Sequence, residues 1–394
     1  IINGRVTVDW DTVQLKSITG FIDSGFKRGS DLDGISLEIG PLPLRRVNDY
    51  SAESFTQELR LQSTQGDKID WTVGFFYAKD EFDTDNDIQI LPKDTGANGD
   101  PVAFINQNSR QFEFETQALF ADINWHVSDT VDIIVGGRYS EDEVSAVDDD
   151  SNRDAAVNPV SDKVTFDDFS PRFVVRYQPN DDLNLYASAS KGYKAGGTDV
   201  SSASRSEGAP FKSEDLWSYE LGFKSLLADG RVSLSGAVFA LEWTDFQVQS
   251  NRLADPNDIA SSIETTQNAE KASSTGFELE LLALAAESLT LGANIGYTDS
   301  KFDDFKNAIL KGQTNGEDNI IDVSGQPLPR TPEWTYSISA DYGFEFGSNW
   351  DGYARLDWSW VDKQFSNIEA IGSLVGETVS GETFNLTQFP SEIP

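Results

Sequence analysis

The chain has 394 residues, and its 66 acidic against 30 basic side chains give a formal net charge of −36. That balance disfavours a nucleic-acid partner, because a phosphate backbone requires Lys and Arg to displace its counterions. Cysteine and methionine are both absent, even at position 1, which excludes disulfides and thiolate sites and leads us to expect a processed product or a fragment.

Membrane-spanning helices are excluded by the lack of long apolar runs. The longest purely apolar run, 281–286, is far shorter than the roughly 18 residues that a spanning helix needs. A membrane strand needs only about 9–11 residues with one apolar face. A transmembrane β-barrel is therefore compatible with the composition.

Alternating apolar and polar residues predict β-strands along the whole chain. The period is two, which places successive side chains on opposite faces of a strand, and no helical period of similar quality occurs. The clearest alternating segments, in chain order, are 71–78, 131–139, 217–224, 277–281, 289–298 and 334–346. The fold class is predicted to be all-β.

Two segments break the alternation. In 110–125, Phe112 and Phe114 have one parity, whereas the later apolar residues have the other: Leu119, Ala121, Ile123 and Trp125. One inserted residue near Thr116 would swap the faces and reconcile the two runs, so a β-bulge is expected there. The segment 232–243 shows a similar slip.

The connections alternate between short and long. Short turns are expected at 63–70, 128–130, 178–182, 228–230, 286–288 and 347–349. Long polar segments separate them at 82–109, 141–164, 195–215, 249–271 and 302–331. Outer-membrane barrels have this asymmetry, with short periplasmic turns and long extracellular loops. The count gives about fourteen strands in a transmembrane antiparallel up-and-down β-barrel.

In such a barrel the apolar face points outward to lipid and the polar face lines a lumen. Two interfacial aromatic girdles are then expected, with Trp71, Trp125 and Trp350 beside short turns and Trp217 and Trp334 beside long loops. Charged residues on the polar faces are expected to face the lumen and to pair across strands, mainly for structural reasons. These residues are Glu58, Arg60, Arg138, Glu220, Lys224, Glu278 and Glu280. The alternative is a large soluble β-sandwich or solenoid with an ordinary solvent face.

Three short motifs resemble binding sites for ions or phosphate. The run Asp83, Asp85, Asp87 begins like a calcium loop, but the required glycine and final glutamate are missing, so a solvated acidic loop is predicted there and at 148–150. "KGYKAGG" lacks the Lys-Ser/Thr pair of a phosphate-binding loop and is interpreted as glycine at a strand end. We expect no metal site and no cofactor.

His126 is the only histidine. It follows Trp125 beside a short turn, where a periplasmic rim is expected. A hydrolytic triad would need a serine and a carboxylate near it. An enzymatic barrel is kept as an alternative, although the chain is not expected to be an enzyme.

Six stretches follow one another in order: "FTQELRLQS", "DWTVGFFYAKDEF", "SPRFVVRYQPNDDLNLYASASKGYKAGG", "LWSYELGFKS", "STGFELELLA" and "GQPLPRTPEWTYSISADY". Their order and spacing resemble the barrel of TonB-dependent outer-membrane receptors. The resemblance implies a barrel of about 22 strands closed by a plug domain. No plug sequence is visible, so 1–394 is interpreted as part of one barrel domain, with 366–394 as an extracellular loop leading to further strands.

The resemblance also implies a function. It implies active uptake of a scarce nutrient (a ferric siderophore, haem, cobalamin or an oligosaccharide) at the bacterial outer membrane. The implied partners are outer-membrane lipid, an extracellular small-molecule ligand and the TonB–ExbB–ExbD complex, which would act through the plug. Two alternatives stay open: a plugless, porin-like passive channel, and a surface barrel with an adhesive or structural role.

Overall fold

The computed structural model describes residues 1–31, 44–64, 66, 68–90, 101, 103–150, 159–200, 209–253, 262–306, 308–310, 319–347 and 350–368. They form one sheet of fourteen strands, in which every neighbouring pair is antiparallel and consecutive strands of the sheet lie side by side. The predicted number of strands and the up-and-down order are therefore confirmed. The sheet strands are β1 (Ile2–Asp9), β2 (Val13–Asp31), β3 (Leu44–Ser63), β4 (Ile69–Ile90), β5 (Ala103–Ser128), β6 (Val131–Asp150), β7 (Val160–Asn180), β8 (Leu183–Lys194), β11 (Glu214–Leu227), β12 (Val232–Leu253), β13 (Ser262–Ala286), β14 (Leu289–Asp304), β17 (Trp334–Phe346) and β18 (Trp350–Val361).

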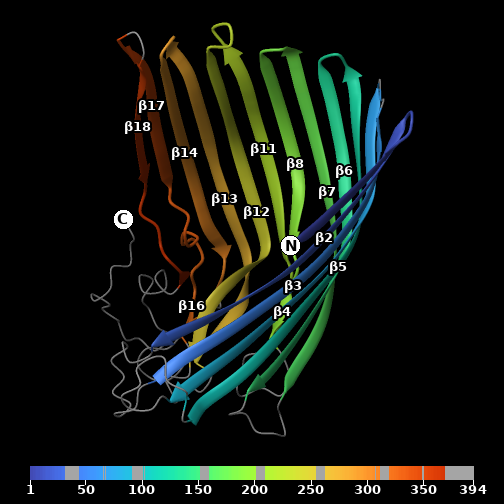
Figure 1. Cartoon of the computed structure of the whole chain (residues 1–394), viewed down its shortest axis with the longest axis vertical. Helices are drawn as coiled ribbons and strands as arrows, with labels where there is room; N and C mark the ends of the chain where they lie inside the picture. The colour runs from blue at the N-terminus through green and yellow to red at the C-terminus, as the bar shows by residue number, and fades with distance from the viewer. Residues whose placement is uncertain are drawn as a thin grey trace.

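The sheet is curled. Figure 1 shows the blue strands at the N-terminal side passing in front of the green ones, while β17 and β18 form the opposite margin. In the described part of the chain, β1 pairs only with β2 and β18 only with β17, so the curled sheet has two margins. Two small hairpins lie outside the sheet, β9 (Gly197–Asp199) with β10 (Ala209–Phe211) and β15 (Ala308–Leu310) with β16 (Asn319–Ile321). Nowhere in the described ranges is there a helix with the length and hydropathy needed to cross a membrane.

The strands are longer than the sequence indicated. All six predicted short turns are present, but much of each predicted long loop is strand: β4 extends to Ile90 and β5 begins at Ala103, inside the expected loop 82–109. Asp83, Asp85 and Asp87 accordingly lie in β4, and the expectation of an acidic loop there is wrong. A strand satisfies its backbone by cross-strand bonds, so it needs no apolar face where both of its faces meet water.

The outer face carries an apolar band along the half of each strand next to the short turns. On β6 the outward residues run from Val131 through Val135 to Tyr139, and the next outward residue is Glu141. Val135 and Tyr139 are about half exposed, at 51% and 48%. The change from apolar to charged recurs on β4, between Tyr77 and Lys79. The band is about nine residues long per strand, which matches the length of a membrane strand.

Neither predicted bulge exists. The pairing of β5 with β6 is regular from Asn108 to His126, so Thr116 sits in an undisturbed ladder. The pairing of β12 with β13 is likewise regular from Val232 to Thr244. The apolar residues change face because the surroundings change along one continuous strand, and no residue is inserted.

Two apolar clusters lie at the end of the inner face away from the short turns. The first is built on Phe302, which is fully buried, with Phe305, Val323, Leu328 and Ile368. The second joins Ala146, Val160 and Val200, with Phe112 packed against them. Both clusters contain residues from outside the sheet strands, and these residues pack on the inner wall. The core of the described residues therefore lies inside the curl, between the apolar band and the long-loop ends of the strands.

Candidate functional site

The inner face is the candidate functional surface. In the half of the sheet whose outer face carries the apolar band, the charged side chains lie on the inner face. At the short-turn end, His126 Nδ1 lies 2.5 Å from Asp132 and His126 Nε2 lies 3.0 Å from Asp70. Arg176 donates to the same Asp132 carboxylate from Nε at 2.8 Å and from Nη2 at 2.5 Å. The four side chains come from β4, β5, β6 and β7, and they link these strands across the wall.

The contacts of His126 do not match those of a hydrolytic triad. A triad histidine needs one ring nitrogen for the serine and the other for the carboxylate. Both nitrogens of His126 contact carboxylates, and Ser63 Oγ donates to Asp70 at 3.2 Å. The sole histidine is thus an electrostatic link between strands in this structure.

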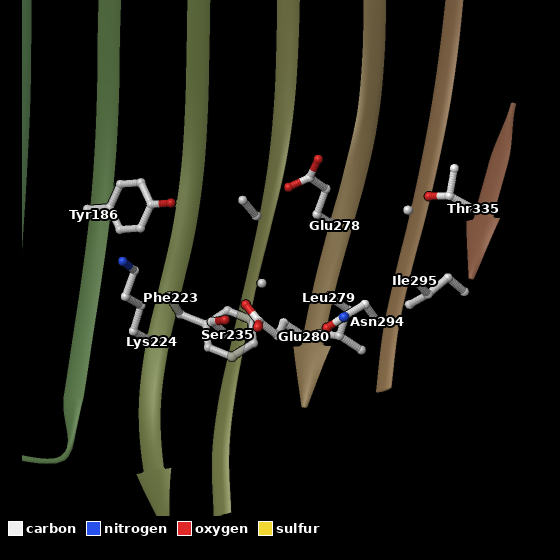
Figure 2. A pocket seen from close by; sticks show the side chains of 13 residues that line it. Tyr186, Phe223, Lys224, Ser235, Glu278, Leu279, Glu280, Asn294, Ile295 and Thr335 are labelled. Atoms are coloured by element: carbon white, nitrogen blue, oxygen red, sulfur yellow. The ribbon is translucent and has the colours of Figure 1, made fainter. Parts of the chain in front are cut away.

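A polar pocket of about 380 Å³ lies midway along the inner wall, between β8 and β17. Figure 2 shows Tyr186 and Lys224 on neighbouring strands, with Glu278 and Glu280 together on β13. The register brings Tyr186 and Glu278 into one row through Gly222 and Ala237. A side chain at Gly222 would collide with the Tyr186 ring, because its Cβ would lie 2.5 Å from Tyr186 Cζ.

The predicted lumenal residues are distributed over three local arrangements. Glu58 and Arg60 pair along β3 at 2.5 Å, which differs from the cross-strand pairing expected. The Arg138 guanidinium on β6 lies 5.1 Å from the centroid of the Phe76 ring on β4, across the intervening strand β5. Glu220 accepts a hydrogen bond from the Tyr186 hydroxyl at 2.5 Å.

Lys224, Glu278 and Glu280 share the pocket, yet no ion pair joins them in the part of the chain that the structure describes. Tyr186, Asp132 and Arg176 are not among the predicted lumenal residues, although all three have the parity of the polar face of their strands. The described ranges hold no group of three or more His, Asp or Glu side chains placed to bind a metal ion.

The five tryptophans of the expected girdles lie at opposite ends of the apolar band. Trp125 and Trp350 are 49% and 74% exposed near short turns, and Trp71 lies two residues inside the start of β4. At the other end, Trp217 stacks on Tyr219 with ring centroids 6.0 Å apart. Trp334 contacts the Tyr297 ring at 4.7 Å and stacks on Tyr336 at 5.7 Å.

Beyond the band, the β9–β10 hairpin lies against β6, β7 and β13. Gly196 allows its close approach, because a Cβ there would lie 2.4 Å from both the Phe166 ring and the Phe211 carbonyl oxygen. The "KGYKAGG" glycines therefore mark a strand end that folds inward. Gln247 Nε2 donates to the carbonyls of Ala195 at 2.9 Å and Lys212 at 3.1 Å, which fixes the base of the hairpin.

Beyond the band, acidic side chains occur on both faces of the sheet and have different surroundings on each. Asp148 is fully buried on the inner side and accepts hydrogen bonds from Asn108 and Arg110, so the expectation of a solvated acidic loop at 148–150 is wrong for Asp148. On the outer side, Lys79 pairs with Glu81 at 2.7 Å and with Glu113 at 2.9 Å. Hydrogen bonds to these two carboxylates raise the pKa of Lys79 above its ordinary value.

A protein-family model described as "TonB dependent receptor-like, beta-barrel" matches residues 5–387. Among named relatives, the chain is 32% identical to the pesticin receptor of Yersinia pestis over 168 residues, which are 42% of this chain and 23% of that protein. It is 34% identical over 180 residues to the metal-pseudopaline receptor CntO of Pseudomonas aeruginosa, covering 45% of this chain and 21% of that protein.

Solved structures show the same fold. The ferric yersiniabactin uptake receptor FyuA from Yersinia pestis superposes with a TM-score of 0.69 at 21% identity, covering 92% of this chain and 49% of that one. The siderophore receptor PiuA from Acinetobacter baumannii gives a TM-score of 0.67 at 16% identity, covering 92% and 54%. The chain thus spans about half the length of these structures, and the aligned regions cover less than a quarter of the named relatives.

Proposed function

The chain belongs to the TonB-dependent receptor β-barrel family, and from that premise we propose that it is part of an outer-membrane receptor for TonB-dependent uptake of a scarce nutrient. Members of this family bind extracellular ligands and interact with TonB. The observation that carries the proposal is the family match over 5–387 together with a fourteen-stranded antiparallel sheet whose apolar band faces outward. The described sheet is one continuous portion of a barrel wall.

We propose a metal chelate as the nutrient. The names of the relatives support this, because they refer to ferric yersiniabactin, a siderophore and metal-pseudopaline. The chelate is recognised at the long-loop end of the inner face, where the wall rises above the band. Haem, cobalamin and oligosaccharides, which the sequence left open, become competing substrates in the test.

The remaining parts of the proposal follow from membrane physics. The outward apolar band contacts outer-membrane lipid, with Trp71, Trp125 and Trp350 at the periplasmic interface and Trp217 and Trp334 at the extracellular one. The inner charged residues support the wall and its packing against a plug in the complete protein. Residues 1–394 belong to one barrel domain; the predicted extracellular loop 366–394 lies outside the described residues from position 369 onward. ExbB and ExbD supply work through TonB. No catalytic step is proposed.

The decisive experiment measures uptake by the full-length protein. Cells that lack their own ferric receptors would express it and receive ⁵⁵Fe chelates, haem, cobalamin or labelled oligosaccharides. Saturable uptake of a ferric chelate that disappears with a protonophore and in a strain without TonB is the expected result. Uptake that persists without TonB would establish the passive channel, and cell or matrix binding with no uptake of any compound would establish the adhesive alternative.

A further inference from the structure

Two apolar grooves lie next to each other on the outer face, within the apolar band. The first, of about 450 Å³, extends from Phe173 on β7 to Ala240 on β12. The second, of about 460 Å³, extends from Leu185 on β8 to Leu279 on β13. Leu221 on β11 lines both, so the two grooves adjoin. Apolar side chains around an open groove lack packing partners unless a second molecule fills it.

The grooves form because large and small outward residues alternate between neighbouring strands. β11 presents large ones, among them Tyr219 and Leu221. Ala189 on β8 and Ala240 on β12 pair directly with Tyr219 and are small. Phe173 on β7 pairs with Ala189 and forms the other side of the first groove. Because neighbouring strands lie about 4.8 Å apart, the large residues of β7 and β11 are about 10 Å apart, which leaves the width of one acyl chain between them.

Aromatic rings continue this surface to the long-loop border of the band. Phe277, which lines the second groove, stacks on Tyr297 with ring centroids 5.9 Å apart. Tyr297 contacts Trp334 at 4.7 Å, and Tyr336 contacts Trp360 at 5.4 Å. Trp334 stacks on Tyr336, so the five rings form one continuous outward cluster over β13 to β18. Such rings prefer the level at which lipid headgroups begin.

Two lysines lie just beyond this border on the outer face. Lys301 on β14 pairs in register with Ser273 on β13, and Lys271 lies two residues past Ser273. The residues that follow the lysines, Ala272 and Phe302, are buried in the inner cluster, so the lysines point outward, where both are exposed. Within the described ranges, neither ammonium group forms an ion pair or a hydrogen bond.

Other lysines of the outer face beyond the band are neutralised by carboxylates. The pairs are Lys27 with Asp49 at 3.1 Å, Lys79 with Glu81 at 2.7 Å and Lys163 with Glu143 at 2.5 Å. These three lysines belong to β2, β4 and β7, on the side of the sheet away from the grooves. Two unpaired lysines beside the grooves therefore set this part of the outer face apart.

The lysines stay unpaired although acids are near. Exposed carboxylates on the surrounding outer surface are those of Glu242, Asp299 and Glu333. Asp304, which pairs in register with Lys271, is held by Lys306 at 3.0 Å. Among the residues that the structure describes, no carboxylate neutralises Lys271 or Lys301. Both charges are thus available to an anion from outside the chain.

We propose that the two grooves together with Lys271 and Lys301 bind a phosphorylated lipid of the outer leaflet that has several acyl chains. The acyl chains fill the grooves, and the phosphate groups contact the two lysines, which act as point charges. Grooves, aromatic cluster and lysines follow one another from the band outward, in the same order as the chains, the interface and the headgroup of a lipid. The proposal requires the membrane orientation given above, but it does not require uptake of any nutrient.

Lipid titrations of the purified full-length protein test the proposal, with bound lipid counted by native mass spectrometry in detergent. The probes are lipid A, which is diphosphorylated and has six acyl chains, phosphatidylethanolamine, which is zwitterionic, and inorganic pyrophosphate. K271Q/K301Q removes both charges, and A189L/A240L fills the first groove with apolar atoms. Lys163→Gln and Ala121→Leu are the matched controls, since both residues lie on the outer face away from the grooves.

We expect lipid A to bind more tightly than phosphatidylethanolamine. K271Q/K301Q should weaken lipid A binding by about 10–30-fold and leave phosphatidylethanolamine unchanged. A189L/A240L should weaken lipid A binding by about 3–10-fold, because a filled groove no longer accepts a chain. Lys163→Gln and Ala121→Leu should bind lipid A as the wild type does.

Three results would each overturn the proposal. Equal affinities for lipid A and phosphatidylethanolamine would mean that the grooves hold ordinary bilayer lipid. An unchanged lipid A affinity in K271Q/K301Q would remove the lysines from the site. Pyrophosphate binding as tight as that of lipid A would indicate a phosphate site that does not recognise acyl chains. Loss of nutrient uptake by the full-length protein would contradict the proposed function and leave the lipid site standing.

Discussion

The two halves of the same strands follow opposite rules. In the half next to the short turns, apolar side chains such as Val135 face outward, and charged ones such as Arg138 face inward. In the other half, charged residues such as Lys79 face outward, whereas Phe302 and Phe112 pack inward. Apolar side chains lie on the face of the strand that is shielded from water. This is the outer face within the apolar band and the inner face beyond it, as expected for a strand that extends out of a membrane.

Both arrangements of apolar side chains occur on β5, which has no bulge between them. Leu119, Ile123 and Trp125 are 62%, 50% and 49% exposed on the outer face, whereas Phe112 packs into an inner cluster. β12 repeats the change, because Val238 is 54% exposed outward and Trp243 packs inward against the cluster around Phe302. A change of parity in a long strand is therefore a signal of a membrane boundary as well as of a bulge.

The largest expected effect comes from the inner cluster of the long-loop half. Phe302→Ala removes a fully buried ring and should lower the free energy of unfolding by about 3–5 kcal/mol, measured by urea unfolding of the full-length protein in lipid vesicles. Lys301→Ala, one residue away on the outer face, should change it by less than about 0.5 kcal/mol. Equal effects would show that the two faces of this half do not differ.

A charge in the apolar band tests the other half. Val135→Arg places a guanidinium near the middle of the outward band and should cost about 2–4 kcal/mol, because an arginine there loses its hydration. Glu141→Arg, on the same face of β6 but past Tyr139, should cost about 0–1 kcal/mol. The assay is the fraction of protein that folds into vesicles as a function of urea. A tolerated arginine at position 135 would contradict a lipid-facing band.

Acidic residues on opposite faces of the long-loop half should also differ. Asp148→Ala leaves Arg110 and Asn108 without their buried acceptor and should destabilise the protein by about 1–3 kcal/mol. Asp85→Ala, on the outer face of β4, should be neutral within about 0.5 kcal/mol. Thermal unfolding followed by far-UV circular dichroism compares them, and a neutral Asp148→Ala would restore the interpretation of a solvated acid.

The smallest effect is expected on the outer face just past the band. Lys79→Gln breaks the exposed pairs with Glu81 and Glu113. The loss should be at most about 1 kcal/mol in low salt and should fade near 1 M salt, because exposed ion pairs are screened. Urea titrations at two salt concentrations measure it. A large, salt-independent loss would mean that this outer surface is not exposed to water.

The alternation and the spacing of turns were enough to predict about fourteen antiparallel strands, and the large sheet of the described residues has fourteen. Strand lengths were underestimated, because polar residues in 82–90 look like loop when one apolar face is assumed throughout. The bulge near Thr116 was wrong for the same reason. The alternation placed Glu220 and Glu278 on the polar face of their strands. Their partners depend on the register between strands, so the hydrogen bond between Tyr186 and Glu220 could not be predicted from the sequence.

β5 extends well beyond the apolar band on the long-loop side. From Gln117, the first polar outward residue, the strand continues back to Ala103; with a tilt near 45° this corresponds to roughly 30–35 Å of height. In the proposed uptake function, a ligand that binds at the long-loop ends of the strands still has to cross this height before it reaches the depth of the bilayer. Its capture and its translocation would therefore depend on different residues, the first near the long-loop ends of the strands and the second nearer the short turns.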